Sequence, residues 1–182
     1  MRKLPLLLTS ILLGLLLAGC AGSEVEGRQP TLSLAPCRLS GGVEAQCATL
    51  AVPENRAAPG GRTIDLNIAV LPATGSSSVV EDDPLFLLAG GPGQAATEVY
   101  PSAAFLFEDV NRTRDIVLLD QRGTGDSNGF DCPALKNEDL PADMPDDDLV
   151  ALLGECRVQL AEQADLTQYS TDAFIDDLED VR

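Results

Sequence analysis

Histidine and tryptophan are both absent from the 182 residues, and aromatic residues make up only 4% of the sequence. Histidine is the usual base that takes the proton from a serine or cysteine nucleophile, so these residues cannot supply a Ser–His–Asp triad by themselves. Its absence also argues against a zinc site, because the cysteines contain no C-x-x-C pair that could replace it.

Basic residues are scarce, with 12 Lys and Arg against 29 Asp and Glu, which gives a formal net charge of −17 at pH 7. A surface of this charge repels phosphate backbones and anionic lipid headgroups. We therefore expect no nucleic acid among the partners of this protein.

The N-terminal residues have the pattern of a secretory signal. Arg2 and Lys3 precede an almost wholly apolar run over residues 4–18, which is shorter than the roughly 20 residues that a membrane-spanning helix needs. The run ends in LAGC, which resembles a bacterial lipobox and predicts a signal peptide over residues 1–19 and lipidation of Cys20. We expect an exported, membrane-anchored bacterial lipoprotein, on the periplasmic or cell-surface side. An ordinary signal peptide with a chance cysteine is the alternative.

Residues 20–36 carry Gly, Ser, Glu and Pro without apolar periodicity, which is typical of a flexible tether. Residues 37–182 then provide enough chain for one domain with its own core. Four cysteines remain in this domain, an even number that suits an oxidising compartment. They allow three pairings, of which we favour Cys37–Cys47 and Cys132–Cys156 because each pair brackets one loop. A zinc site is the competing use.

The apolar pattern predicts four strands. Residues 47–52 and 63–71 flank a Pro- and Gly-rich turn and indicate an antiparallel hairpin with a long loop. Residues 85–89 are an unbroken apolar run, which is typical of a strand buried on both faces of a parallel sheet. Residues 115–120 (DIVLLD) are a second candidate for such a strand. Each of these two runs ends in a glycine-containing loop, the arrangement of a doubly wound α/β fold.

Helices are expected around these strands. Residues 95–110 have a helical composition apart from Pro101, residues 130–148 have the composition of a loop, and residues 149–164 can form a second helix. A last helix begins with Ser170 or Thr171 as its N-cap. Its apolar stripe consists of Phe174, Ile175, Leu178 and Val181.

Two loop motifs connect the chain to a family. Residues 89–94 (AGGPGQ) and 120–127 (DQRGTGDS) resemble the HGGPG and DQRGxGxS loops of the α/β-hydrolases in the proline iminopeptidase and tripeptidyl aminopeptidase branch. Residues 169–182, from Tyr-Ser-Thr to Arg182, resemble a YTT…DL…R helix of the same proteins. Ala89 replaces the family's histidine, which favours the exported tripeptidyl-aminopeptidase-like form.

The resemblance implies a fold and a site. The fold would be the N-terminal part of an α/β-hydrolase, with a mostly parallel sheet, an N-terminal antiparallel hairpin and helices on both faces. Gly90, Gly91, Pro92 and Gly93 would form the oxyanion-hole loop, in which Gly90 and Gly91 are the expected N–H donors because proline has none. A second, pocket-lining loop would contain Asp120, Gln121, Arg122, Gly123, Gly125 and Ser127, and we interpret its role as structural.

Residues 125–129 (GDSNG) match the G-x-S-x-G pattern of a nucleophile elbow, but we reject that interpretation. The elbow serine stands on a sharp turn between a strand and a helix, whereas Ser127 comes seven residues after the predicted strand.

The expected function is that of a serine aminopeptidase, which releases amino acids or short peptides through an acyl-enzyme. Its substrate would be a peptide or amino-acid derivative, with no metal or cofactor. The catalytic Ser, Asp and His are expected beyond residue 182, so this chain alone is expected to be inactive. The alternative is a non-catalytic surface lipoprotein or pseudoenzyme that binds a partner.

Overall fold

The structure is a computed structural model that describes residues 32–182 except 77–78, 92, 133–134, 136–140 and 142. The predicted signal peptide (1–19), Cys20 and Pro92 therefore lie outside the described residues, as does the tether as far as residue 31. Residues Leu32–Arg182 form one compact unit.

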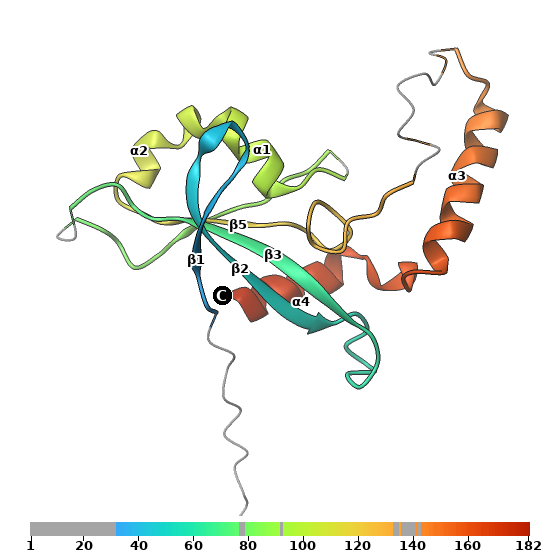
Figure 1. Cartoon of the computed structure of the whole chain (residues 1–182), viewed down its shortest axis with the longest axis horizontal. Coiled ribbons are helices and arrows are strands. Elements are labelled where there is room, and N and C mark those ends of the chain that lie inside the picture. The colour runs from blue at the N-terminus through green and yellow to red at the C-terminus, as the bar shows by residue number, and fades with distance from the viewer. Residues whose placement is uncertain (1–31, 77–78, 92, 133–134, 136–140, 142) are drawn as a thin grey trace, which may run out of the picture. The chain divides into compact units, whose positions relative to one another are not determined.

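A five-stranded mixed sheet is the centre of this unit (Figure 1). Its strands are β1 (Ala35–Arg38), β2 (Glu44–Pro53), β3 (Thr63–Leu71), β4 (Leu85–Leu87) and β5 (Ile116–Leu119). The spatial order is β1-β2-β3-β5-β4, and β4–β5 is the one parallel pair among the described strands. The prediction of a mostly parallel sheet is therefore wrong. Successive strands at the N-terminal side pair as hairpins, and only β4 and β5 are joined by a helical crossover.

The predicted hairpin of residues 47–52 and 63–71 is confirmed as β2 and β3. Leu50 pairs with Leu66 and Val52 with Ile64, so alternate apolar side chains lie on one face of the sheet. The pattern did not reveal β1, which starts within the predicted tether and contains Pro36, Cys37 and Arg38. An edge strand that buries little shows no apolar alternation.

The helical segments are η1 (Ser40–Gly42), α1 (Ala96–Ala103), η2 (Ala104–Leu106), α2 (Glu108–Asn111), α3 (Asp146–Ala161), η3 (Leu166–Gln168) and α4 (Thr171–Val181). The three predicted helices are present, but the first is interrupted, α3 begins three residues earlier than predicted, and the short helices η1 and η3 were not predicted. The segment predicted over residues 95–110 is divided into three short pieces, with Pro101 inside α1. The predicted N-cap is confirmed, because the Ser170 side chain accepts a hydrogen bond from the backbone N–H of Ala173.

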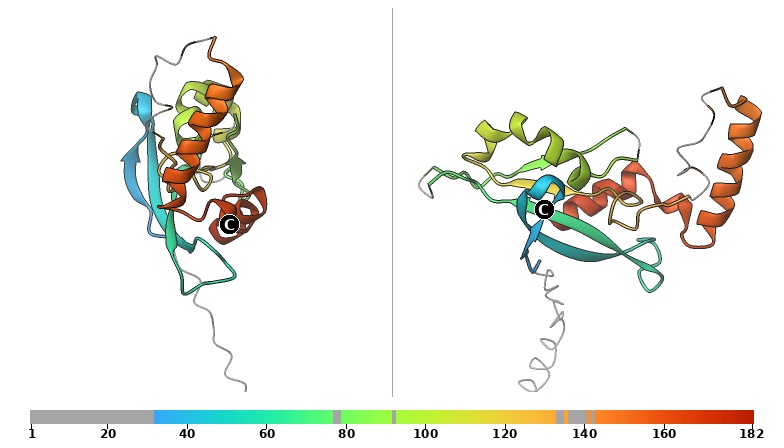
Figure 2. Two further views of the ribbon diagram at one scale, coloured as in Figure 1. Left: turned by 90° about the vertical axis from the view of Figure 1, so that its right-hand side faces the viewer. Right: turned by 45° about the horizontal axis from the view of Figure 1, so that its top comes forward.

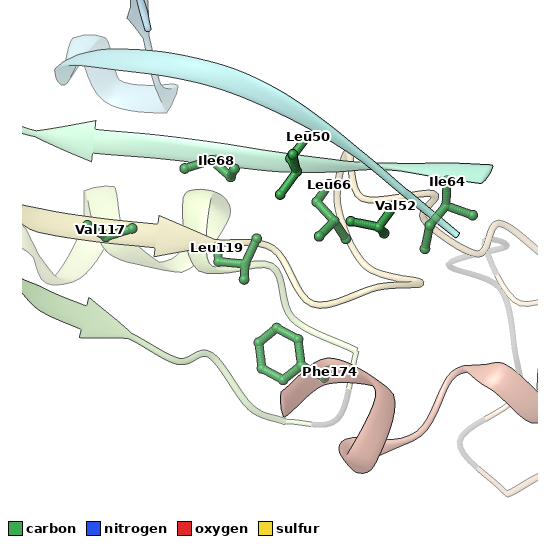
Figure 3. Close-up of a cluster of buried hydrophobic side chains, with 8 residues drawn as sticks. All are labelled: Leu50, Val52, Ile64, Leu66, Ile68, Val117, Leu119 and Phe174. Atoms are coloured by element: carbon green, nitrogen blue, oxygen red, sulfur yellow. The ribbon is translucent and has the colours of Figure 1, made fainter. Parts of the chain in front are cut away.

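Helices cover both faces of the sheet, as expected (Figures 1 and 2). Figure 3 shows one face, where Phe174 of α4 lies against the side chains of β2, β3 and β5. The other face carries Tyr100 of α1 over Ile116 and Leu118. The prediction that Ile175 belongs to the buried stripe of this helix is wrong, because 52% of Ile175 is exposed.

The two runs predicted as doubly buried strands differ. β5 is buried along its whole length, as expected, whereas every residue of β4 is half-buried. β4 is the outermost strand of the described sheet, so one of its edges has no strand beside it.

Two disulfides, Cys37–Cys47 and Cys132–Cys156, join the cysteines in the favoured pairing. Disulfides persist in oxidising compartments, so they indicate an extracellular or otherwise oxidising location. Within the described ranges, no helix has the length and apolar character to span a membrane.

Candidate functional site

The two glycine-containing loops follow the two parallel strands. β4 leads into the loop of Gly90–Gly93, and β5 leads into the loop of Asp120–Ser127. Because β4 and β5 are parallel neighbours, both loops leave the sheet at the same edge. In α/β folds the carboxyl ends of parallel strands are the usual position of a ligand site. This edge is therefore the candidate site.

The first loop presents its backbone to solvent. Gly90, Gly91 and Gly93 are all exposed, and their N–H groups make no hydrogen bond within the part of the chain that the structure describes. Gly91 has a φ of 146° and Gly93 a φ of 88°, values that side-chain-bearing residues rarely adopt. The glycines thus permit a conformation that leaves backbone donors free.

Asp120 connects this loop to the sheet. Its buried carboxylate accepts hydrogen bonds from the Thr97 backbone N–H (2.9 Å), the Thr97 hydroxyl (2.8 Å) and the Asn67 side-chain amide (2.8 Å). Thr97 lies in the first turn of α1, whose N-cap residue Ala95 offers no side-chain acceptor. Asp120 therefore supplies the missing cap from another element and fixes the point where the first loop enters the helix.

Gly125 brings the two loops into contact. A Cβ atom at Gly125 would lie 2.5 Å from the Cβ of Ala95 and 2.7 Å from Oδ2 of Asp120. No side chain fits at such distances, and the φ of 48° adds backbone strain for any other residue. The second loop thus packs directly on the exit of the first.

Arg122 anchors the second loop to the C-terminal helix. Its Nε and Nη2 each donate to the carboxylate of Asp177 at 2.7 Å, and its Nη1 donates to the backbone carbonyls of Glu54 and Gln168. Arg122 and Asp177 are both buried, and Arg56 gives Asp177 a second cation at 2.6 Å. A paired, fully bonded arginine holds structure rather than a ligand. Gln121 is also part of the loop's own turn, since its carbonyl accepts from Thr124.

Ser127 is fully buried, and its hydroxyl oxygen accepts a hydrogen bond from the backbone N–H of Asn67 at 2.8 Å. It forms a short antiparallel bridge with Thr124, and in the described residues between Ser127 and Asp146 no helix begins. This geometry differs from that of a nucleophile elbow, so it agrees with the rejection of G-x-S-x-G at this position.

Tyr169 closes the far side of the second loop. Its ring lies 4.4 Å from the ring of Phe130, and its hydroxyl donates to Oε1 of the buried Glu54 while it accepts from Asn128. Burial, reinforced by the Glu54 carboxylate, raises the pKa of Tyr169 to about 12. A Cβ at Gly123 would lie 3.0 Å from this ring.

Sequence reasoning missed the partners Asn67, Thr97, Glu54 and Asp177. One signal for them existed, because Asn67 is a polar residue in the middle of the apolar β3 pattern and its amide bonds to Asp120. In the described residues, no group of three His, Cys, Asp or Glu side chains is placed to hold a metal ion.

The molecule is thus an α/β protein in which two loops pack against each other at one edge of the sheet. Its sequence is similar to part of several mycobacterial proteins. No protein-family model matches the chain. Carboxylesterase B of Mycobacterium tuberculosis, in strains CDC 1551 and H37Rv, is 35% identical over 94 residues. A Mycobacterium bovis protein named as a putative hydrolase has the same identity over the same length. The similarity covers 50% of this chain and 16% of each relative, so it is distant and partial.

Proposed function

We propose that this chain belongs to a hydrolase that works by acyl transfer, of the serine aminopeptidase type. The observation that carries the proposal is the Gly90–Gly93 loop, whose free backbone N–H groups stand at the carboxyl end of a parallel strand. An acyl-transfer enzyme needs donors of this kind to stabilise the oxyanion that develops on the attacked carbonyl. Gly90 and Gly91 are the proposed donors.

Two further observations support this function. The sheet combines an N-terminal antiparallel hairpin with the parallel pair β4 and β5, two features that the resemblance to α/β-hydrolases implies. The relatives are described as a carboxylesterase and a hydrolase, which agrees with acyl transfer but names esters rather than peptides. The aminopeptidase assignment rests on the AGGPGQ and DQRGTGDS motifs.

The nucleophile and its base would come from residues that follow Arg182 in a longer protein. The 182 residues contain no histidine, and Ser127 is buried. We further propose that the protein is exported and held at a membrane by lipid on Cys20, which the lipobox-like LAGC sequence and the two disulfides support.

The test is hydrolysis by the protein made from the complete reading frame, with peptidyl p-nitroanilides and p-nitrophenyl esters as substrates. Gly91→Ala is expected to lower kcat about 10²- to 10³-fold, because a side chain at a φ of 146° displaces the donor loop. Gly60→Ala is the matched control, since a Cβ there meets no atom within 4 Å. Equal activity of Gly91→Ala and wild type would remove the oxyanion role. Hydrolysis of the esters without hydrolysis of the anilides would favour an esterase.

A further inference from the structure

Arginines are almost all neutralised in this acidic protein. Seven described arginines form an ion pair with a carboxylate, namely Arg38, Arg56, Arg62, Arg112, Arg114, Arg122 and Arg182. Arg157 of α3 is the one arginine in the described ranges without such a partner. With 29 acidic residues in the chain, an unpaired guanidinium is a departure from the general pattern.

Arg157 stands in the wall of a cavity. The cavity has a volume of about 550 Å³ and lies between α3 and the segment that follows the second loop. Its apolar lining includes Phe130, Leu153, Leu160 and Tyr169. On its other side, Arg157 also lines a second cavity of about 580 Å³. Asp131, the acidic residue of the first wall, already takes part in an interaction within the protein.

The cavity adjoins the candidate site. Phe130 and Tyr169 belong to its lining, and both rings lie within 3.2 Å of the position a Cβ would take at Gly123. The loop of Gly123 contacts Ala95 through Gly125, and Ala95 is separated from the Gly90–Gly93 loop by Gln94 alone. An unbroken series of packed residues therefore leads from the proposed oxyanion loop to the cavity.

A disulfide holds the helical wall of the cavity. Cys156 is the one residue of α3 that is buried, and it is bonded to Cys132. Neighbouring apolar residues of α3 are open to solvent, with Leu153 47% exposed. An apolar surface next to an unpaired cation fits a ligand that carries an apolar group and one carboxylate.

We propose that this cavity is a subsite for the carboxylate end of a short peptide, with Arg157 as its anchor. The proposal rests on the proposed function and adds a substrate class, namely peptides with a free C-terminal carboxylate and an apolar last side chain. A guanidinium binds a carboxylate through two parallel N–H···O bonds, and the apolar lining offers a contact surface for the neighbouring side chain. Binding of the carboxylate needs no catalytic residue.

Binding of N-acetylleucine, followed by NMR titration of the 182-residue chain, tests the subsite. N-acetylleucine amide, which lacks the charge, is the matched neutral probe. Hexanoate also combines a carboxylate with an apolar group, and it tests whether the subsite prefers a fatty acid to a peptide. Arg157→Gln is expected to weaken N-acetylleucine binding about tenfold and to leave the amide's binding unchanged. Arg112→Gln removes an arginine that is mostly exposed and paired only with Asp109, so it should have no effect.

Preferential binding of N-acetylleucine over its amide, lost in Arg157→Gln, would support the subsite. Equal binding of the two probes, no binding of N-acetylleucine, or an equal loss in Arg112→Gln would overturn it. Tighter binding of hexanoate than of N-acetylleucine would overturn the peptide assignment. If only the proposed function fails, the complete protein will not hydrolyse the substrates, although N-acetylleucine still binds to the cavity.

Discussion

Asp120 illustrates how a single residue of a family-like motif works through its hydrogen bonds. Its carboxylate joins β3, through Asn67, to the first turn of α1, through Thr97. The carboxylate therefore sets the position of the loop that enters α1. Every hydrogen-bond partner of the Asp120 carboxylate is a donor, so both carboxylate oxygens must act as acceptors.

Asp120→Asn is expected to lower the free energy of unfolding by about 2 kcal/mol, because the new amide nitrogen faces the N–H of either Asn67 or Thr97. Urea denaturation measures the change. Asp126→Asn, an exposed position in the same loop, should change stability by less than about 0.5 kcal/mol. Similar losses in the two variants would contradict the assigned role of Asp120.

Tyr169 provides a pH test. Its pKa is raised from 10.0 to about 12, so the folded state favours the neutral phenol. This contribution to stability is fully present below about pH 10, where unfolded tyrosine also keeps its proton, and is lost as the pH rises toward 12. The midpoint of urea unfolding should fall more steeply between about pH 10 and about pH 12 in wild type than in Tyr169→Phe. Parallel curves would show that Tyr169 titrates normally.

The residue-scale features were only partly predictable. The loops were visible as glycine-containing motifs after apolar runs, but their hydrogen-bond partners were not. Arg122 and Asp177 are 55 residues apart, and Asp120 and Asn67 are 53 apart. Such pairs depend on tertiary packing, which neither periodicity nor local composition encodes.

Among the helices and strands, α4 is the one whose structure follows most clearly from the pattern of apolar residues in the sequence. Its N-cap, its length and the burial of Phe174 follow from the sequence, because the apolar residues recur at helical spacing against an acidic background. Ile175 lies one position outside the buried stripe and remains exposed.

Phe174→Ala is expected to destabilise the protein by about 3 kcal/mol or more, because it leaves a cavity between α4 and the sheet (Figure 3). Ile175→Ala, at the neighbouring exposed position, should cost less than about 1 kcal/mol. Thermal or urea unfolding of the two variants compares them directly. A loss at Ile175 as large as that at Phe174 would mean that α4 faces the sheet differently.

The strands show that the apolar pattern predicts the bounds of a strand better than it predicts the burial of that strand. β3 has the predicted bounds, since its β-branched alternation and flanking turn residues mark both ends. The apolar run of β4 predicted burial on both faces, yet β4 is half-buried because no described strand lies beyond it. Burial of a strand depends on its neighbours as much as on its composition.

At the scale of the whole molecule, the described sheet combines an antiparallel hairpin with one parallel pair, and it carries the proposed oxyanion loop without a base. The relatives extend far beyond the matched region, which is 16% of their length. Under the proposed function, the catalytic serine and histidine would belong to a longer protein, and the loops described here would lie at the edge of the sheet that receives them.

The most direct test is labelling with a fluorophosphonate, which reacts only with an activated serine, followed by mass spectrometry of the labelled peptide. We predict that the protein made from the complete reading frame is labelled at a G-x-S-x-G serine beyond Arg182, and that the 182-residue chain is not labelled. Labelling within the 182 residues, at Ser127 above all, or no labelling of the complete protein, would contradict the proposed hydrolase.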